Sequence, residues 1–260
     1  MKKTSAFLAA LAVTFLSLTA SAQDKQLFNH VALGASAGID GLGVELVLPA
    51  TPYLQIRGGY SILPYTYTNN LNLGKIEIAG FKKDATNVPI SATPWQGGLG
   101  KVFLDIFPGR GLPFRFVAGA FFGSGKLIDV NADLRSVLEP KDYKTGFGYN
   151  GISISTDGDG FAHMDASVLK VLPYLGLGFG RPLNLQKRVG FSFELGVVYT
   201  GGVKVTAYDY SNPHKVQTSV VTSKNLVDDN GKQLDNGLID KVSGIPVLPM
   251  MKLGVYVRVF

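Results

Sequence analysis

The chain ends in a stretch of alternating side chains, Met251-Lys252-Leu253-Gly254-Val255-Tyr256-Val257-Arg258-Val259-Phe260. Residues 251, 253, 255, 257 and 259 are apolar, whereas lysine, glycine and arginine stand between them. A side-chain period of two is that of a β-strand with one apolar face and one polar or small face. The fold therefore depends on which environment covers the apolar face.

The first residues, 1–22, have the three parts of a cleavable export signal. Two lysines give a positive start, an apolar core follows at 6–18, and Ala20-Ser21-Ala22 is a typical cleavage site. An uncleaved anchor is the alternative, but the apolar core is shorter than the ~20 residues that a helix needs to cross a bilayer. We therefore predict a signal peptide over 1–22, cleaved after Ala22, and one mature domain of residues 23–260.

Composition limits what the mature chain can do. The absence of cysteine excludes disulfides and thiolate metal sites. The net charge of +6 falls to +4 without Lys2 and Lys3, and the cations form no block, so nucleic-acid binding is not supported. Anionic lipid head groups suit this modest excess. Past the signal, no apolar run is long enough for a membrane helix, so a membrane location requires a closed barrel.

Eight amphipathic stretches are predicted as β-strands, most of them near the ~9–11 residues that a tilted membrane strand needs. Their ranges are 30–39, 42–49, 53–62, 95–106, 114–125, 168–180, 189–200 and 249–260. The pattern predicts an all-β fold: a closed, antiparallel, up-and-down transmembrane β-barrel.

The connections between these strands alternate in length. The short ones are 50–52, 107–113 and 181–188, and the long ones are 63–94, 126–167 and 201–249. If both termini are periplasmic, the short turns fall in the periplasm and the long loops fall outside the cell, as in outer-membrane barrels. Extended stretches within the long loops leave two alternatives open: β-hairpins above the membrane, or a barrel of ten strands.

Each predicted strand has one largely apolar face, which we assign to lipid. Aromatic residues recur on this face near both strand ends, as membrane interfaces favour. The face includes Leu33, Val44, Leu46, Leu54, Tyr60, Val102, Phe116, Phe122, Leu175, Phe179, Phe191, Leu195 and Tyr199.

The opposite face combines glycines with charges. Its charged members include Glu45, Arg57, Lys101, Asp105, Arg115, Glu194, Lys252 and Arg258. An eight-stranded barrel has an interior that side chains just fill, and buried charges must be paired. We therefore predict a plugged lumen in which Glu45, Asp105 and Glu194 pair with Arg57, Lys101, Arg115 or Arg258, while glycines make room.

A soluble, lipocalin-like barrel with the apolar face inside is the alternative that alternation alone does not exclude. It would expose the glycine-rich face to water, and it would have no use for aromatic residues at both strand ends. The difference between short and long connections would also be accidental. These features favour the membrane interpretation.

The mature chain resembles the small bacterial outer-membrane β-barrels of the OmpA, OmpX and OmpW type, in the version common in Bacteroidetes. The resemblance rests on the export signal, the eight strands, the polar lumen and the terminal Phe260. It implies a Gram-negative outer membrane, with Phe260 as the signal for the barrel assembly machinery and with outer-membrane lipid and lipopolysaccharide as surroundings.

Two features depart from that family pattern. Arg258 and Tyr256 are in step with Phe260, where the family has apolar residues, so we expect a bulge near the end of the strand. No peptidoglycan-binding domain follows the barrel, so the tethering role of longer relatives is not implied.

Little in the sequence points to catalysis, and we predict neither a cofactor nor a metal site. His30, His163 and His214 each lack a serine two residues along, which a lipid A deacylase of this architecture would have. His163 with a nearby loop aspartate is the single candidate for a protease-like pair at the rim. Asp157-Gly158-Asp159-Gly160 hints at calcium, but a flexible acidic turn is favoured because Val168 stands where a carboxylate is needed.

Three functions follow in order of preference. The first is a structural or interaction role, in which long extracellular loops bind an external ligand or another outer-membrane protein. The second is a narrow conduit for small or apolar solutes. The third is a rim enzyme that acts on lipid A or on peptides.

Overall fold

The computed structural model describes residues 30–72, 74–78, 81–85, 87–144, 147–149, 152–184, 186–212, 214–222, 241, 243–244 and 246–259. The predicted signal peptide with its cleavage site at Ala22, and the predicted assembly signal Phe260, lie outside these residues. Among them, no helix is long and apolar enough to span a membrane.

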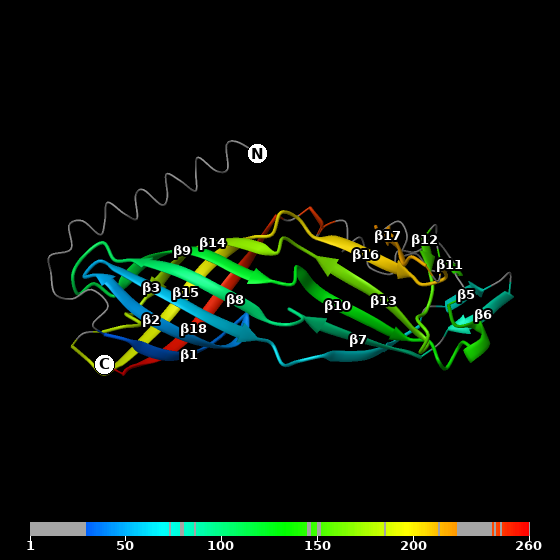
Figure 1. Cartoon of the computed structure of the whole chain (residues 1–260), viewed down its shortest axis with the longest axis horizontal. Coiled ribbons are helices and arrows are strands. Elements are labelled where there is room, and N and C mark those ends of the chain that lie inside the picture. The colour runs from blue at the N-terminus through cyan, green and yellow to red at the C-terminus, as the bar shows by residue number, and fades with distance from the viewer. Residues whose placement is uncertain are drawn as a thin grey trace.

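Eight antiparallel strands form a closed barrel in the order β1-β18-β15-β14-β9-β8-β3-β2 (Figure 1). Each overlaps one predicted range, so the predicted closed barrel is confirmed, and the ten-strand alternative is wrong for the barrel. The strands are β1 (Ala32–Gly38), β2 (Gly41–Thr51), β3 (Leu54–Ile62), β8 (Leu99–Ile106), β9 (Phe114–Gly123), β14 (Val171–Phe179), β15 (Val189–Tyr199) and β18 (Val247–Arg258).

The turn between β1 and β2 depends on one glycine. Gly41 has φ of 97°, in the region that side chains rarely adopt. A Cβ at this position would lie 2.1 Å from the carbonyl oxygen of Ile62 in the neighbouring strand. The tight return of the first hairpin therefore requires glycine.

The barrel wall separates two kinds of surface. Apolar side chains point outward: Val44 is 68% exposed, and Leu175 and Phe191 are each 65% exposed. Arg57 and Arg115 point inward and are 0% exposed. The charged face is therefore the lumen, and the lipocalin-like arrangement is wrong.

The last strand keeps its alternation to the end of the described chain. Its register against β1 runs without a shift from Lys252 to Arg258, so the predicted bulge is absent there. Tyr256 is fully buried while Val257 is 43% exposed. The departure from the family pattern has a physical reason, because the Tyr256 ring fills part of the lumen.

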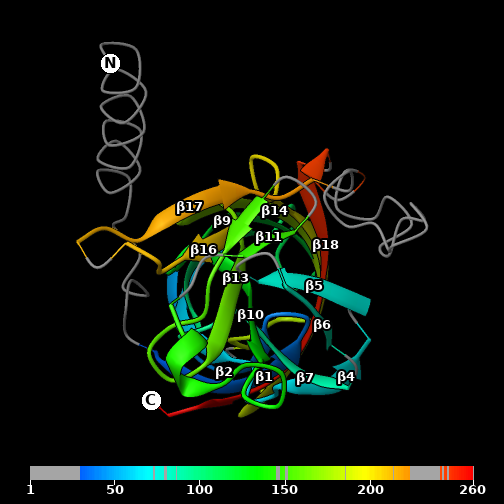
Figure 2. The ribbon, with the colours of Figure 1, turned by 90° about the vertical axis from the view of Figure 1, so that its right-hand side faces the viewer.

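The long connections build a second body at the end of the barrel opposite the start of β1 and the end of β18 (Figure 1). We call this body the extension; Figure 2 views the molecule from its end. It contains a six-stranded sheet, β17-β16-β13-β10-β7-β4, and a four-stranded sheet, β12-β11-β5-β6. The extra strands predicted in the loops thus lie above the barrel and not in its wall.

The elements of the extension are β4 (Tyr67–Leu71), β5 (Gly74–Ile78), β6 (Phe81–Ala85), β7 (Val88–Pro94), β10 (Lys126–Asp133), the 3₁₀ helix η1 (Pro140–Asp142), β11 (Phe147–Tyr149), β12 (Ile152–Ile154), β13 (Phe161–Ser167), β16 (Lys204–Asp209) and β17 (Gln217–Val220). They share a hydrophobic core of their own, made of Ala85, Val88, Leu134, Leu138, Ile154, Ala162, Ala207 and Val221. The extension is therefore a packed body and not a set of separate loops.

Candidate functional site

Arg57 lies at the centre of a buried ion-pair cluster inside the barrel. Its Nη1 is 3.0 Å from Glu45 Oε2, its Nε is 2.7 Å from Asp105 Oδ2, and its Nη2 is 2.5 Å from Glu194 Oε2. All four side chains are 0–1% exposed. One guanidinium thus contacts three carboxylates that come from three different strands.

Three further cations complete this lumen network. Arg115 contacts Asp105 at 3.3 Å and Glu194 at 3.0 Å. Lys101 and Lys252 each lie near Glu45, with Nζ to Oε1 distances of 2.9 and 3.0 Å. Buried charges are tolerated when they are paired, and this network is paired throughout.

The charges of the network balance. Its four cations are Arg57, Lys101, Arg115 and Lys252, and its four carboxylates are Asp40, Glu45, Asp105 and Glu194. Asp40, from the first hairpin turn, contacts Lys101 at 2.8 Å. A neutral cluster presents no net charge that would attract an ion into the lumen.

The structure brings together six of the seven residues that the sequence predicted to form ion pairs in the lumen. The seventh, Arg258, takes part in none of these ion pairs. It is half-buried at the last residue of β18, where it pairs with Ala32 of β1. Asp40, Lys252 and Tyr256 belong to the cluster but were not in the predicted set. The side-chain period already placed Lys252 on this face, whereas Asp40 was hidden in a turn.

Tyr256 extends the network toward the end of the barrel that carries the short turns. Its hydroxyl donates to Glu45 Oε2 at 2.7 Å and lies 3.4 Å from Arg57 Nη1. Two glycines make the space for its ring, because a Cβ at Gly34 or Gly254 would lie 2.1 or 2.6 Å from ring carbons. Lumen glycines therefore accommodate a tyrosine as well as charged side chains.

An aromatic layer lies against the ion-pair network. The ring centroid of Phe103 lies 5.1 Å from the ring centroid of Phe121 and 5.1 Å from that of Tyr174. The Lys252 ammonium and the Arg57 guanidinium lie 4.5 and 5.1 Å from the Phe103 ring centre, so cation–π contacts join the two layers. The layer also contains Trp95, Leu99, Val117, Leu172, Val198 and Met250.

The short-turn end of the lumen is closed as well. Leu183, in the turn between β14 and β15, is 1% exposed and packs with Ala32, Val47 and Tyr256. Gln55 holds this turn in place, because its Nε2 donates to the Leu183 carbonyl at 2.7 Å and its Oε1 accepts from the Leu183 N–H at 3.4 Å. The lumen is therefore filled by three successive layers of side chains.

The rim pair suggested by the sequence forms on the extension. His163 Nε2 lies 2.9 Å from Asp157 Oδ2, and His163 Nδ1 bonds to Asn131 Oδ1. The other oxygen of Asp157 accepts the backbone N–H groups of Asp159 and Phe161. Partial burial alone would raise the pKa of Asp157, but these hydrogen bonds outweigh it and hold that pKa below its usual value. Asp157 thus fixes a turn through these hydrogen bonds, so the turn is more ordered than the flexible acidic turn that the sequence predicted.

A second polar cluster lies beside this pair on the same sheet. Asp129 and Asp165 face each other across β10 and β13, and both are at least nine-tenths buried. Lys126 contacts Asp129 at 2.8 Å. A hydrogen bond to Asp165, helped by burial, raises the pKa of Tyr208 to about 12. Within the described chain, no group of three or more acidic or histidine side chains is placed to hold a metal ion.

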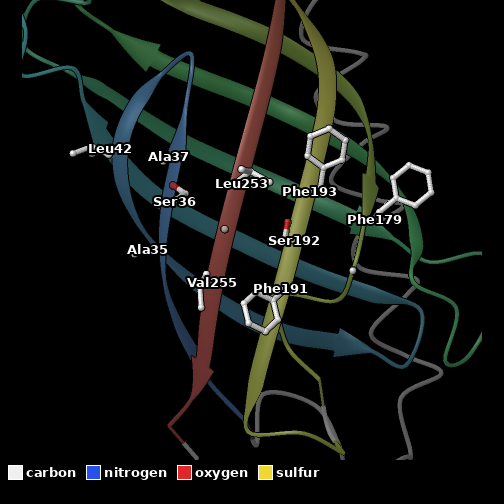
Figure 3. Close-up of a pocket in the computed structure, with 12 residues that line it drawn as sticks. Ala35, Ser36, Ala37, Leu42, Phe179, Phe191, Ser192, Phe193, Leu253 and Val255 are labelled. Atoms are coloured by element: carbon white, nitrogen blue, oxygen red, sulfur yellow. The ribbon is translucent and has the colours of Figure 1, made fainter.

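The outer wall of the barrel carries two apolar grooves. The first crosses β1, β18 and β15 and has a volume of about 670 Å³ (Figure 3). Ala35 and Ala37 line one side of it, and Phe191 and Phe193 line the other. The second groove, of about 660 Å³, includes Ala118 and Leu177 among its lining residues.

A small polar pocket adjoins the first groove at the short-turn end. It has a volume of about 240 Å³ and includes Arg181, Asn184 and Lys187 in its lining. Gly180 and Phe191 line both this pocket and the first groove, so the two are continuous.

No protein-family model and no curated protein matches the chain. Among solved structures, it is similar to CarO and CarO2 of Acinetobacter baumannii, at 19% and 20% sequence identity and TM-scores of 0.42 and 0.47. Each alignment covers 90% of this chain, and 99% and 100% of those chains. A major outer membrane protein from Thermus thermophilus is 15% identical with a TM-score of 0.38, over 88% of this chain and 98% of that one. At these TM-scores, our account of the barrel rests on its own strand pairing.

Proposed function

We propose that this chain is an integral barrel of a Gram-negative outer membrane that conducts no solutes and binds a partner through its extension. The observation that carries the proposal is the filled lumen: an aromatic layer, an ion-pair network and the Leu183 turn succeed one another inside the barrel. A barrel that is closed inside offers its other surfaces for function.

The outer surface supports the membrane location. Barrel strands of 7–12 residues present apolar side chains outward, near the ~9–11 residues that cross a bilayer at a tilt. A wall with Val44, Leu175 and Phe191 each at least 65% exposed would be costly to hold in water. The proposed surroundings are outer-membrane lipid on the wall and lipopolysaccharide near the extension, with insertion by the barrel assembly machinery.

The extension supports the interaction role. It is held together by its own hydrophobic core. Its strands β7, β10, β13 and β16 pair with one another in a sheet beyond the barrel wall. A packed body on a rigid scaffold is a suitable place for binding an extracellular ligand or a second outer-membrane protein. The Asp157–His163 pair on this body keeps the rim enzyme as the third-ranked function, because a hydrogen-bonded acid and histidine are two parts of a catalytic site.

Single-channel recording in a planar bilayer distinguishes a closed barrel from a conduit. We expect no steady openings from the wild-type protein. The matched control is Phe103→Gly combined with Tyr174→Gly, Arg57→Ser and Glu194→Ser, which empties two layers and should open a path. Wild-type openings as frequent and as large as those of this variant would establish the conduit instead.

The orientation has its own test, since the chain contains no cysteine. Ser211→Cys on the extension should react with a membrane-impermeant maleimide in intact cells. Gln186→Cys in a short turn should react only after the outer membrane is permeabilised. The reverse result would place the extension in the periplasm.

A further inference from the structure

The groove across β1, β18 and β15 has features that lipid-facing surface alone does not require. Its polar end lies in the turn between β14 and β15, where Arg181 and Lys187 line the adjoining pocket. We propose that the groove and this pocket together form a binding site for one anionic diacyl phospholipid of the periplasmic leaflet. The proposal rests on the membrane placement given above.

The apolar part of the site fits an acyl chain. In Figure 3, Phe191 and Phe193 project from β15, and Leu253 and Val255 follow β18 beside them. Cross-strand register places Ala35 opposite Val255 and Ala37 opposite Leu253. Two small alanines beside two large phenylalanines leave a depression in the wall. Because the side chains around this depression are apolar, they favour contact with a hydrocarbon chain.

The polar part of the site fits a phosphate. Lys187 is exposed, and among the described residues neither it nor Arg181 has a carboxylate partner. Lysine and arginine are the side chains that bind phosphate groups, and basic pockets at membrane surfaces hold anionic head groups.

Arg181 is held where a head group would lie. Its Nε donates to the Leu112 carbonyl at 3.1 Å, and its Nη2 donates to the Gly109 carbonyl at 3.0 Å. The guanidinium carbon also lies 4.1 Å from the Phe107 ring centre. These contacts use two of its five N–H donors and fix its charge beside the polar pocket, so little ordering is needed when a phosphate binds.

Continuity and position make the site specific for a phospholipid of one leaflet. The apolar groove and the basic pocket share Gly180 and Phe191, as an amphipathic molecule with its phosphate at one end of its chains requires. Lipopolysaccharide is excluded because the basic pocket lies among the short turns, opposite the extension. The second groove, near Ala118, shares no lining residue with the basic pocket and so serves as an internal control.

Native mass spectrometry of the full-length mature barrel, titrated with phosphatidylglycerol in detergent, tests the site. We expect a one-to-one complex that is about tenfold weaker for Ala37→Phe, which fills the groove, and for Lys187→Glu, which reverses a pocket charge. Ala118→Phe in the second groove and Lys204→Glu on the extension should bind as the wild type does. Ala35→Phe replaces Ala37→Phe if that variant does not fold.

Equal weakening by Ala37→Phe and Ala118→Phe, or no weakening by either, would mean non-selective lipid contact and would overturn the proposal. Equal binding of zwitterionic phosphatidylethanolamine would overturn the role of the basic pocket. A heat-dependent gel shift and insertion into liposomes are measured on the same samples. If the protein shows no gel shift and does not insert, the membrane placement itself is wrong. If it inserts normally but binds lipid without selectivity, only the lipid site is wrong.

Discussion

Arg57 and Glu194 are joined across the full width of the barrel, with 2.5 Å between Nη2 and Oε2. β3 and β15, which carry them, are four strands apart in either direction around the ring. The same guanidinium also contacts Glu45 and Asp105, on the two strands that flank β3. A single side chain thus connects opposite walls of the lumen, and Lys101, Arg115 and Lys252 supply the remaining positive charges of the network.

Replacing Arg57 by leucine should lower the free energy of unfolding by about 3–5 kcal/mol, because three buried carboxylates lose their central cation. The measurement is urea unfolding in detergent, followed by the fluorescence of Trp95, the single tryptophan of the chain. Adding Glu194→Gln to Arg57→Leu should recover part of the loss. A double variant less stable than Arg57→Leu alone would contradict the central place of Arg57 in the network.

The space around Tyr256 gives a second prediction. Gly34→Ala should hinder folding, because the new Cβ would meet the tyrosine ring at 2.1 Å. Gly58→Ala is the matched control, since its nearest neighbour would be 4.0 Å away. In a Tyr256→Ala background, Gly34→Ala should lower the free energy of unfolding by much less. A double-mutant cycle of unfolding free energies measures this difference. Additive effects would mean that the ring does not limit the space at Gly34.

Acid should loosen the extension before the barrel. The lowered pKa of Asp157 means that its ionised form stabilises the folded state above the ordinary value of 3.8, and that this contribution disappears as the pH falls through the folded-state value. Hydrogen exchange of β13 amides from pH 6 to pH 2.5 should show increasing opening at the acid end. In the Asp157→Asn variant, the β13 amides should exchange rapidly already at neutral pH, and their opening should depend less on pH. If the variant opened in acid as the wild type does, Asp157 would be excluded as the cause.

The apolar wall predicts where a charge blocks assembly. Leu195→Arg should prevent membrane insertion, at a cost of ~2–4 kcal/mol near the bilayer midplane. Val220→Arg, which is exposed on the extension at 54%, is the matched control and should insert normally. Heat-dependent gel mobility of membrane fractions reports both variants. Normal insertion of Leu195→Arg would mean that this side chain does not face lipid.

The side-chain period of two allowed the barrel to be predicted from sequence, because it fixes which residues share a face along a strand. It assigned Arg57, Glu194 and Leu195 to their correct sides. It carried no information on which strands lie opposite in the ring, so the contact from β3 to β15 could not be foreseen.

The remaining omissions have local causes. Asp40 lies in a turn, where periodicity gives no face. Tyr256 is on the lumen face by its position, but because it is in step with Phe260, where the family pattern has an apolar residue, the sequence predicted a bulge instead. The sheets of the extension were anticipated only as hairpins, because their pairing joins β7, β10, β13 and β16 from separate loops.

The central claim is that the apolar face of the wall meets lipid while the charged face fills the interior. A cysteine scan with spin labels along β15 in liposomes tests it directly, since the chain has no native cysteine. We predict high accessibility to oxygen at positions 191, 193, 195 and 197, and low accessibility to both oxygen and a polar nickel reagent at 192, 194 and 196. Access of the polar reagent to 193, 195 and 197 would contradict the account.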